Sequence, residues 1–261
     1  MIRSLSTAAT GMEAQEKRLD VTAHNIANVS TTGFKKNRAE FEDLMYQTYQ
    51  TPGAATGANS QSPTGLQVGM GVKIVATQRM HSQGDMQQTG NPFDLAIEGN
   101  GFFPINLPSG EVGYTRDGAF KLDAEGKVVN SNGFALASDI TVPPNAETIS
   151  IAADGTVTAS VPGEKEPVSL GKIELATFAN PAGLLAKGKN LYSETAASGT
   201  PITEAPGQNG LGFLAQGSLE GSNVKVVEEM IDLISGQRAY EVNARVVKAA
   251  DEMLQQTANL R

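Results

Sequence analysis

The stretch that decides the fold is residues 217–261, GSLEGSNVKVVEEMIDLISGQRAYEVNARVVKAADEMLQQTANLR. It contains no proline, and alternating steps of four and three residues from Val226 fall mostly on apolar side chains. This heptad pattern is typical of a helix with one apolar seam. Asn223 suits an N-cap, and Glu228 and Glu229 place negative charge near the positive end of the helix dipole. We therefore predict one long helix over about residues 223–258, whose seam must lie on another element.

The N-terminus carries a second apolar stripe of the same period. The residues that recur every seven positions are Leu5, Met12, Leu19 and Ile26. Asn28 and the Ser and Thr residues after it compete for backbone hydrogen bonds, and Gly33 tolerates a positive φ, so the helix should end there. The pattern predicts a first helix over about residues 3–27, which pairs with the C-terminal one in the antiparallel sense.

The middle of the chain has a different composition and a different pattern of apolar residues. Residues 34–49 are mixed and fit either a helix or an extended chain, while residues 50–71 are rich in Gly, Ser, Ala and Pro and indicate a linker or a loop ordered by its neighbours. From residue 72 to about 217, short apolar runs alternate with turn signals, and Asp154-Gly155 between two alternating segments indicates a hairpin.

These patterns predict an α+β fold. It consists of an antiparallel helical pair, formed by the N- and C-terminal segments, and a central antiparallel β sandwich or barrel-like domain. The expected divisions are an N-terminal helix and connector (1–45), an extended segment (46–71), the central β domain (72–217) and the long C-terminal helix (218–261).

Composition and charge exclude several classes of function. The 261 residues include 28 Gly and no Cys, so disulfides, thiolate metal sites and a thiol nucleophile are excluded. The net charge is -8, and residues 41–217 hold nine Lys/Arg against seventeen Asp/Glu, which argues against nucleic acid or an anionic membrane as partners. No apolar run has the length of a membrane span, and polar residues and Glu13 interrupt the N-terminus before a signal-peptide core forms.

A search for catalytic residues finds no constellation. The chain has only two histidines, His24 and His81, and it lacks the spacings of zinc, calcium and phosphate-binding motifs. Neighbouring acids such as Glu228 and Glu229 point in different directions on a helix, unlike the paired carboxylates of a glycosidase. We expect no enzyme activity, no cofactor and no metal site.

The candidate functional residues therefore lie on the terminal helices. Apolar stripes left partly uncovered favour contacts with other copies of the chain, and a head-to-tail contact that does not close a ring produces a helical filament. The predicted assembly seam comprises Leu5, Met12, Leu19, Ile26, Val226, Met230, Leu233, Tyr240, Val247 and Leu254. The candidates for polar contacts across an interface are Asn25, Asn28, Gln237, Arg238 and Glu241. Simple capping by the two asparagines, and a surface pair between Arg238 and Glu241, remain open alternatives.

Three segments carry a resemblance to a known family. They are HNIANVSTTGFKKNRAEFEDLMYQ at 24–47, DLAIEGNGFFPINLPSGEVGYTRDGAFKLDAEGKVV at 94–129 and GSLEGSNVKVVEEMIDLISGQRAYEVNARVV at 217–247. The chain resembles the bacterial flagellar basal-body rod and hook proteins over essentially its whole length. Its length, the FEDLMYQTYQTPGA and GLQVGMGV segments and the single modest middle domain are most similar to the distal rod members of that family.

The resemblance implies a structural subunit of the hollow, rigid drive shaft that passes torque from the motor to the hook. It also implies terminal helices at the inner core of a tube, and a segment at about 46–66 associated with rigidity. The implied partners are copies of the chain, neighbouring rod and hook proteins, the surrounding rings and the flagellar type III export apparatus. The implied location is the periplasmic rod of the basal body, reached without a cleaved signal peptide. The alternatives are a sister axial protein of the proximal rod or hook and, more remotely, a secreted β-rich carbohydrate-active or carbohydrate-binding protein.

Overall fold

A computed structural model describes residues 2–53, 55–57, 60–138, 140–163 and 166–259. The chain forms two compact units. One, which we call the helix unit, comprises residues 1–27, 37–78 and 225–261, and the other, which we call the body, comprises residues 28–36 and 79–224. The four divisions expected from the sequence stay a prediction, since the compact units divide the chain at other positions.

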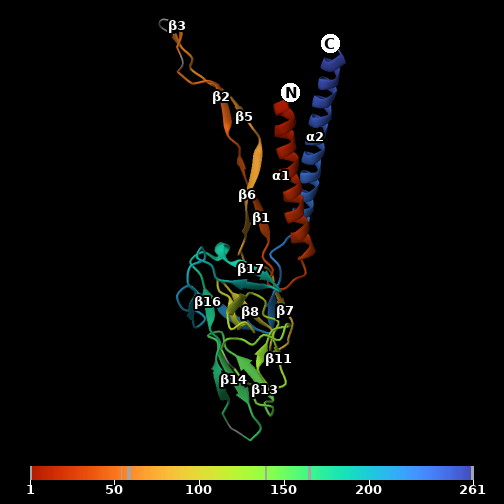
Figure 1. Cartoon of the computed structure of the whole chain (residues 1–261). Coiled ribbons are helices and arrows are strands. Elements are labelled where there is room, and N and C mark those ends of the chain that lie inside the picture. The colour runs from red at the N-terminus through yellow and green to blue at the C-terminus, as the bar shows by residue number, and fades with distance from the viewer. Residues whose placement is uncertain (1, 54, 58–59, 139, 164–165, 260–261) are drawn as a thin grey trace. The chain divides into compact units, whose positions relative to one another are not determined.

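Two long helices dominate the helix unit, as the heptad patterns predict. Helix α1 spans Ile2–Ala27 and helix α2 spans Val226–Asn259. Figure 1 shows them side by side with both chain ends at the same end of the pair, so the pairing is antiparallel. Asn223, expected as the N-cap of α2, has another role, because its side chain accepts a hydrogen bond from the Lys36 amide at 2.7 Å and donates one to the Met80 carbonyl at 2.8 Å.

The rest of the helix unit is a set of two-stranded pairs. Strand β1 (Asn37–Asp43) pairs with β6 (Val72–Arg79), β2 (Tyr46–Gln50) with β5 (Leu66–Gly69), and β3 (Ala55–Gly57) with β4 (Ser60–Gln61). The stretch that the sequence left open between helix and extended chain, residues 34–49, therefore forms strands. The Gly- and Pro-rich residues that follow it fold back antiparallel, with Tyr46 opposite Gly69.

The body is built from short antiparallel strands. They are β7 (Met86–Gln88), β8 (Leu95–Glu98), β9 (Phe103–Asn106), β10 (Val112–Thr115), β11 (Lys121–Leu122), β12 (Val128–Val129), β13 (Thr148–Ile151), β14 (Thr156–Ser160), β15 (Val168–Lys172), β16 (Leu175–Thr177), β17 (Leu185–Gly188), β18 (Leu191–Ser193), β19 (Ile202–Glu204), β20 (Phe213–Gln216) and β21 (Ser218–Glu220), with a 3-10 turn at Pro181–Gly183. The largest sheet has the order β17-β18-β10-β9, and the next has the order β13-β14-β15. The hairpin predicted at Asp154-Gly155 is confirmed, because β13 and β14 pair around it. The α+β class is therefore confirmed, with a β part made of small antiparallel sheets.

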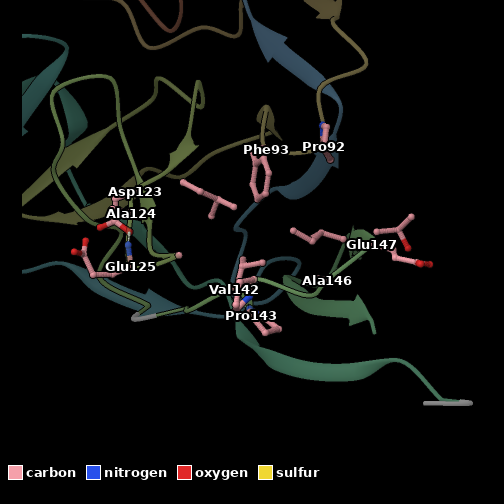
Figure 2. Close-up of a pocket in the computed structure, with 14 residues that line it drawn as sticks. Pro92, Phe93, Asp123, Ala124, Glu125, Val142, Pro143, Ala146 and Glu147 are labelled. Carbon is pink, nitrogen blue, oxygen red and sulfur yellow. Dashed lines mark hydrogen bonds between the residues drawn. The ribbon is translucent and has the colours of Figure 1, made fainter. Parts of the chain in front are cut away.

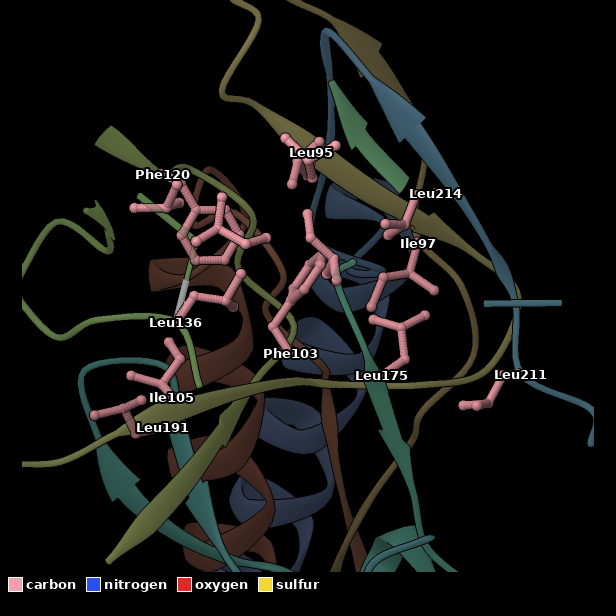
Figure 3. Packing of buried hydrophobic residues seen from close by; sticks show 14 residues of the cluster. Leu95, Ile97, Phe103, Ile105, Phe120, Leu136, Leu175, Leu191, Leu211 and Leu214 are labelled. Atoms are coloured by element: carbon pink, nitrogen blue, oxygen red, sulfur yellow. The ribbon is translucent and has the colours of Figure 1, made fainter. Parts of the chain in front are cut away.

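A single apolar core holds these sheets together. Figure 3 shows side chains from strands far apart in the sequence, among them Leu95, Phe103 and Leu214, gathered in one cluster. The rings of Phe103 and Phe120 meet edge to face with centroids 5.1 Å apart, a favoured aromatic geometry. A second cluster around Phe102, Tyr114 and Phe178 adjoins the largest sheet. The body therefore buries a large apolar core within itself, although Leu185, Ile202 and Phe213 are each more than half exposed.

Candidate assembly surface

The contact between the two helices includes two glycines, one on each helix. The Cα of Gly11 lies so close to Asn243 that a Cβ there would be 3.0 Å from the Asn243 amide nitrogen. A Cβ on Gly236 would be 3.0 Å from a methyl carbon of Leu19. The two glycines, which each cost about 1 kcal/mol of helix propensity, therefore allow the helices to approach closely.

Polar links join the same pair of helices. Asn25 donates a hydrogen bond of 3.1 Å to the Glu229 carboxylate, and both residues are buried. The Asn25 amide also exchanges two hydrogen bonds of 2.9 Å with the backbone of Asn37, which ties the start of β1 to the helix pair. Arg18 and Asp232 form a 2.8 Å ion pair, but both side chains are substantially exposed, so its contribution is at most about 1 kcal/mol.

The contact face of α2 follows a heptad shifted from the predicted seam. Its most buried positions are Glu229, Gly236 and Ala250, spaced by seven or fourteen residues. Large side chains would hold the helices apart, so this face carries small or hydrogen-bonding ones. The apolar pattern alone could not reveal it.

The predicted seam residues divide into two groups. Leu5, Met12, Leu19 and Ile26 of α1 and Leu233, Val247 and Leu254 of α2 are half-buried, whereas Val226, Met230 and Tyr240 are exposed. As an assembly surface, the seam stays a prediction.

The predicted polar contacts also have defined places. Asn28 lies in the turn after α1, where its side chain accepts a hydrogen bond from the Thr31 hydroxyl at 3.2 Å. Gln237, Arg238 and Glu241 are exposed on α2. Glu241 forms an ion pair with Arg245 at 3.7 Å, one helical turn further on. In the contacts described above, only Asn25 of this group links the two helices of one chain. A role of these residues in contacts between chains stays a prediction.

The outer side of α2 is notably apolar for an exposed surface. Its exposed large apolar residues are Val226, Val227, Met230, Ile231, Ile234, Tyr240, Val242, Val246 and Met253. They extend over most of the helix length, and Val227 is 70% exposed. Exposed apolar side chains in this number make α2 a candidate for contact with another protein.

The strand pairs of the helix unit add a second exposed apolar surface. Met45 is 82% exposed, and Tyr46, Tyr49 and Leu66 are each more than half exposed. The guanidinium of Arg3 lies 5.4 Å from the centre of the Tyr49 ring, so one aromatic group rests against α1. A hydrogen bond with Asp43, together with its negative charge, raises the pKa of the Tyr46 phenol.

The body also contains a hollow of different character. It has a volume of about 600 Å³ and is lined by apolar residues such as Phe93, Val142 and Pro143, with Glu125 and Glu147 at its rim (Figure 2). Its lining includes no histidine, serine, lysine or arginine.

Two further observations concern the described residues alone. No group of three or more His, Cys, Asp or Glu side chains there is arranged to hold a metal ion. No helix among them combines the length and apolarity required to cross a membrane.

Comparisons with known proteins match three segments of the chain to family models and its whole length to curated relatives. Residues 5–35 match the family model described as flagella basal body rod protein, residues 96–159 match the flagellar hook protein FlgE/F/G D1 domain, and residues 215–260 match the flagellar basal body rod FlgEFG protein C-terminal model. The chain is 48% identical to the flagellar basal-body rod protein FlgG of Borreliella burgdorferi, over 100% of this chain and 99% of that protein. It is 46% identical to the FlgG proteins of Buchnera aphidicola subsp. Acyrthosiphon pisum and Caulobacter vibrioides, over the full length of both chains in each case. The chain therefore belongs to the family of the flagellar basal-body rod protein FlgG.

Proposed function

We propose that this chain, a structural subunit of the distal rod, polymerises through its terminal helices into a hollow, rigid shaft that transmits motor torque to the hook. Family membership supports the structural role and identifies the chain as a structural protein, not an enzyme. The proposal adds that the terminal helices provide the contact surface between subunits of the polymer.

The observation that carries the proposal is that the residues of α2 that contact α1 differ from its exposed large apolar residues. Its contact with α1 uses Gly236 and Asn243, while large residues such as Ile231 and Ile234 stay exposed. Burying one such side chain contributes about 1.5–3 kcal/mol, so a row of them provides a strong drive towards association. When the same contact repeats head to tail without closing a ring, the product is a helical tube.

The exposed and the half-buried residues of the predicted seam would contribute differently to polymerisation. Val226, Met230 and Tyr240 are exposed and available for contacts with other copies, together with the polar side chains of Gln237, Arg238 and Glu241. The half-buried seam residues would complete those contacts from the groove between α1 and α2. A coiled-coil arrangement between neighbouring subunits follows from the shared period of seven.

The strand pairs at residues 46–66 provide a mechanism for rigidity. Their exposed Tyr46, Tyr49 and Leu66 side chains would gain burial by wedging between neighbouring subunits. Contacts of this kind resist sliding of one subunit past another, which a stiff shaft requires.

The proposed setting is the part of the basal-body rod that crosses the periplasm. Neighbouring rod and hook proteins would contact the ends of the polymer, and ring proteins would surround it. Delivery would use the flagellar type III export apparatus, which the family resemblance implies.

A deletion of residues 225–261 tests the proposal. The purified full chain should form sedimentable polymers at high protein concentration, and the shortened chain should remain soluble at every concentration. A matched control, Lys248→Ser, changes an exposed α2 residue outside the apolar set and should leave polymerisation intact. Undiminished polymerisation of the shortened chain would overturn the proposal. Antibody labelling of isolated basal bodies would separate a distal rod location from the proximal rod and the hook.

A further inference from the structure

The body contains a buried cluster in which one carboxylate serves two cations. Glu220 accepts a bond of 2.6 Å from the Lys35 ammonium and one of 2.5 Å from Nε of Arg116. The Gly84 amide donates a third bond to the same carboxylate at 2.8 Å. The three charged side chains are between 1% and 5% exposed, so water does not screen their interactions.

Backbone carbonyls complete the coordination of both cations. Arg116 donates to the carbonyls of Gly101, Ile97 and Gly99 at 2.6–2.8 Å, and Lys35 donates to that of Ser82 at 2.7 Å. Carbonyl dipoles orient a cation but carry no net charge. Glu220 is therefore the carboxylate that neutralises this part of the body, and the contacts described here give each cation no other.

The segment that carries Glu220 packs closely against the backbone around the cluster, and Lys35 and Arg116 also line a hollow of about 270 Å³. Gly33 adopts a φ of +65°, and a Cβ there would lie 2.7 Å from the carbonyl carbon of Arg116. The Gly33 amide also donates to the Glu220 carbonyl at 2.8 Å. A Cβ on Gly84 would lie 2.1 Å from the Gly221 carbonyl oxygen. Residues 220 and 221 therefore help to close the cluster and bring its carboxylate in the same step.

The pKa values of Glu220 and Lys35 reflect the competition between burial and the attraction of opposite charges. Burial by itself would raise the pKa of Glu220, but the charges of Arg116 and Lys35 hold this pKa below its usual value. Burial lowers the pKa of Lys35 despite its bond to Glu220. The carboxylate is thus the group on which the charged state of the cluster depends.

The order of these residues along the chain determines when the cluster can form during synthesis. Lys35 precedes Glu220 by 185 residues, and Arg116 precedes it by 104. Because a chain is synthesised from its N-terminus, both cations and nearly all of the core strands exist before Glu220 does. A body that closed at that stage would bury two positive charges without a counter-ion, which is strongly unfavourable.

We propose that Glu220 is a closing counter-ion that makes folding of the body conditional on the arrival of the segment leading into α2. Until residue 220 is in place, Lys35 and Arg116 lack their counter-ion, and closure of the body is disfavoured. This inference goes beyond the proposed function, and it holds whether or not the chain polymerises.

Two full-length variants test the inference. Glu220→Gln keeps the shape of the side chain but removes its charge, and it replaces one of the two acceptor oxygens with an NH2 group that faces hydrogen-bond donors of the cluster. It should raise the unfolding constant of the body by roughly 10²- to 10³-fold, measured by urea unfolding and by pulse proteolysis. The triple variant Glu220→Leu, Lys35→Met, Arg116→Met removes all three charges and should recover most of that loss, because apolar residues of similar volume can replace a buried ion cluster.

The control is Glu111→Gln, which removes the carboxylate of an exposed 2.6 Å ion pair with Lys187 and should leave the unfolding constant almost unchanged. An unfolding constant for Glu220→Gln equal to that of the control would overturn the inference. So would a triple variant no more stable than Glu220→Gln, because the defect would then come from lost shape and not from uncompensated charge.

Discussion

The body and the helix unit place their large apolar side chains in opposite environments. In the body, Phe103 and Ile105 are 0% exposed, whereas Ile231 and Val227 on α2 are 59% and 70% exposed. The helix pair instead buries Gly236, Ala250 and the Asn25–Glu229 hydrogen bond. The difference teaches that apolar content alone does not decide what a segment buries. The body buries a large apolar core within one chain, and the helix unit leaves much of its apolar surface exposed.

The largest expected effect comes from replacing a glycine of the body by alanine. Gly118 is buried, and a Cβ there would lie only 1.6 Å from the Leu95 carbonyl oxygen. Backbone atoms on both sides must move, so Gly118→Ala should reduce the free energy of unfolding of the body by at least about 3 kcal/mol. Urea unfolding followed by circular dichroism measures the loss.

A second glycine of the body provides the control for this experiment. Gly110 has a φ of +83° but no atom within 4 Å of the Cβ position. Gly110→Ala should therefore cost only the local backbone strain, about 1–2 kcal/mol. Equal losses at the two positions would mean that close packing does not distinguish Gly118.

The next effect is an acid sensitivity confined to the body. His81 lies edge-on to the rings of Phe102 and Tyr192, with centroids 5.5 Å and 6.1 Å away. Burial, followed by the positive charges of Arg79, Lys35 and Arg116, lowers the pKa of His81 to about 4, and the nearby Pro181 carbonyl opposes this only in part.

The sign of the effect follows from the ordinary histidine pKa of about 6.5 in the unfolded chain. As the pH falls from 6.5 to 4, the unfolded state takes up the proton first, so stability falls, by about 3 kcal/mol in total. Glu220, whose pKa is lowered, adds its own loss below about pH 4.5, as protonation removes its charge. His81→Phe should remove the loss between pH 6.5 and 4.5 in urea unfolding curves. A variant as acid-sensitive as the original chain would show that other groups cause the loss.

The sequence predicted the elements of the molecule better than it predicted their contacts. Helix periodicity and the glycine turns gave α1, α2 and the Asp154-Gly155 hairpin, because these are local features. The contact face of α2 was not predictable, because apolar periodicity cannot tell whether a stripe faces the same chain or another copy. The small residues at positions 236 and 250 were the available signal.

The Glu220 cluster was even harder to predict from the sequence than the contact face of α2. Its partners Lys35 and Arg116 are more than one hundred residues away in sequence, and single charged residues in turn-rich segments look like solvent-exposed ones. Gly118 is similar, because Asp117-Gly118 is only a turn signal in the sequence, whereas the structure requires a glycine there for the close approach of the Leu95 carbonyl. Long-range contacts decide both cases, and local patterns carry no information about them.

A smaller effect is expected from the same glycine substitution in the helix unit. A Cβ on Gly236 would approach the end of the flexible Leu19 side chain at 3.0 Å, which can shift by a few tenths of an ångström. The gain in helix propensity of about 1 kcal/mol offsets this cost, so Gly236→Ala should change the unfolding free energy by less than about 1 kcal/mol. Circular dichroism at 222 nm during thermal unfolding measures it. A loss as large as that of Gly118→Ala would remove the contrast between the two units.

The smallest effect on the isolated chain should come from Ile231→Ser on the exposed side of α2. Its side chain is 59% exposed, so the unfolding free energy should change by no more than about 0.5 kcal/mol. Polymerisation should nevertheless weaken, because burial of that side chain would contribute only when another copy covers it. Ile202→Ser makes the same chemical change at a residue of the body that is 52% exposed, and it should alter neither quantity. If Ile231→Ser lowered the thermal unfolding temperature of the isolated chain while Ile202→Ser did not, the apolar side of α2 would be covered within its own chain. The contrast between a self-sufficient body and a helix unit completed by other subunits would then fail.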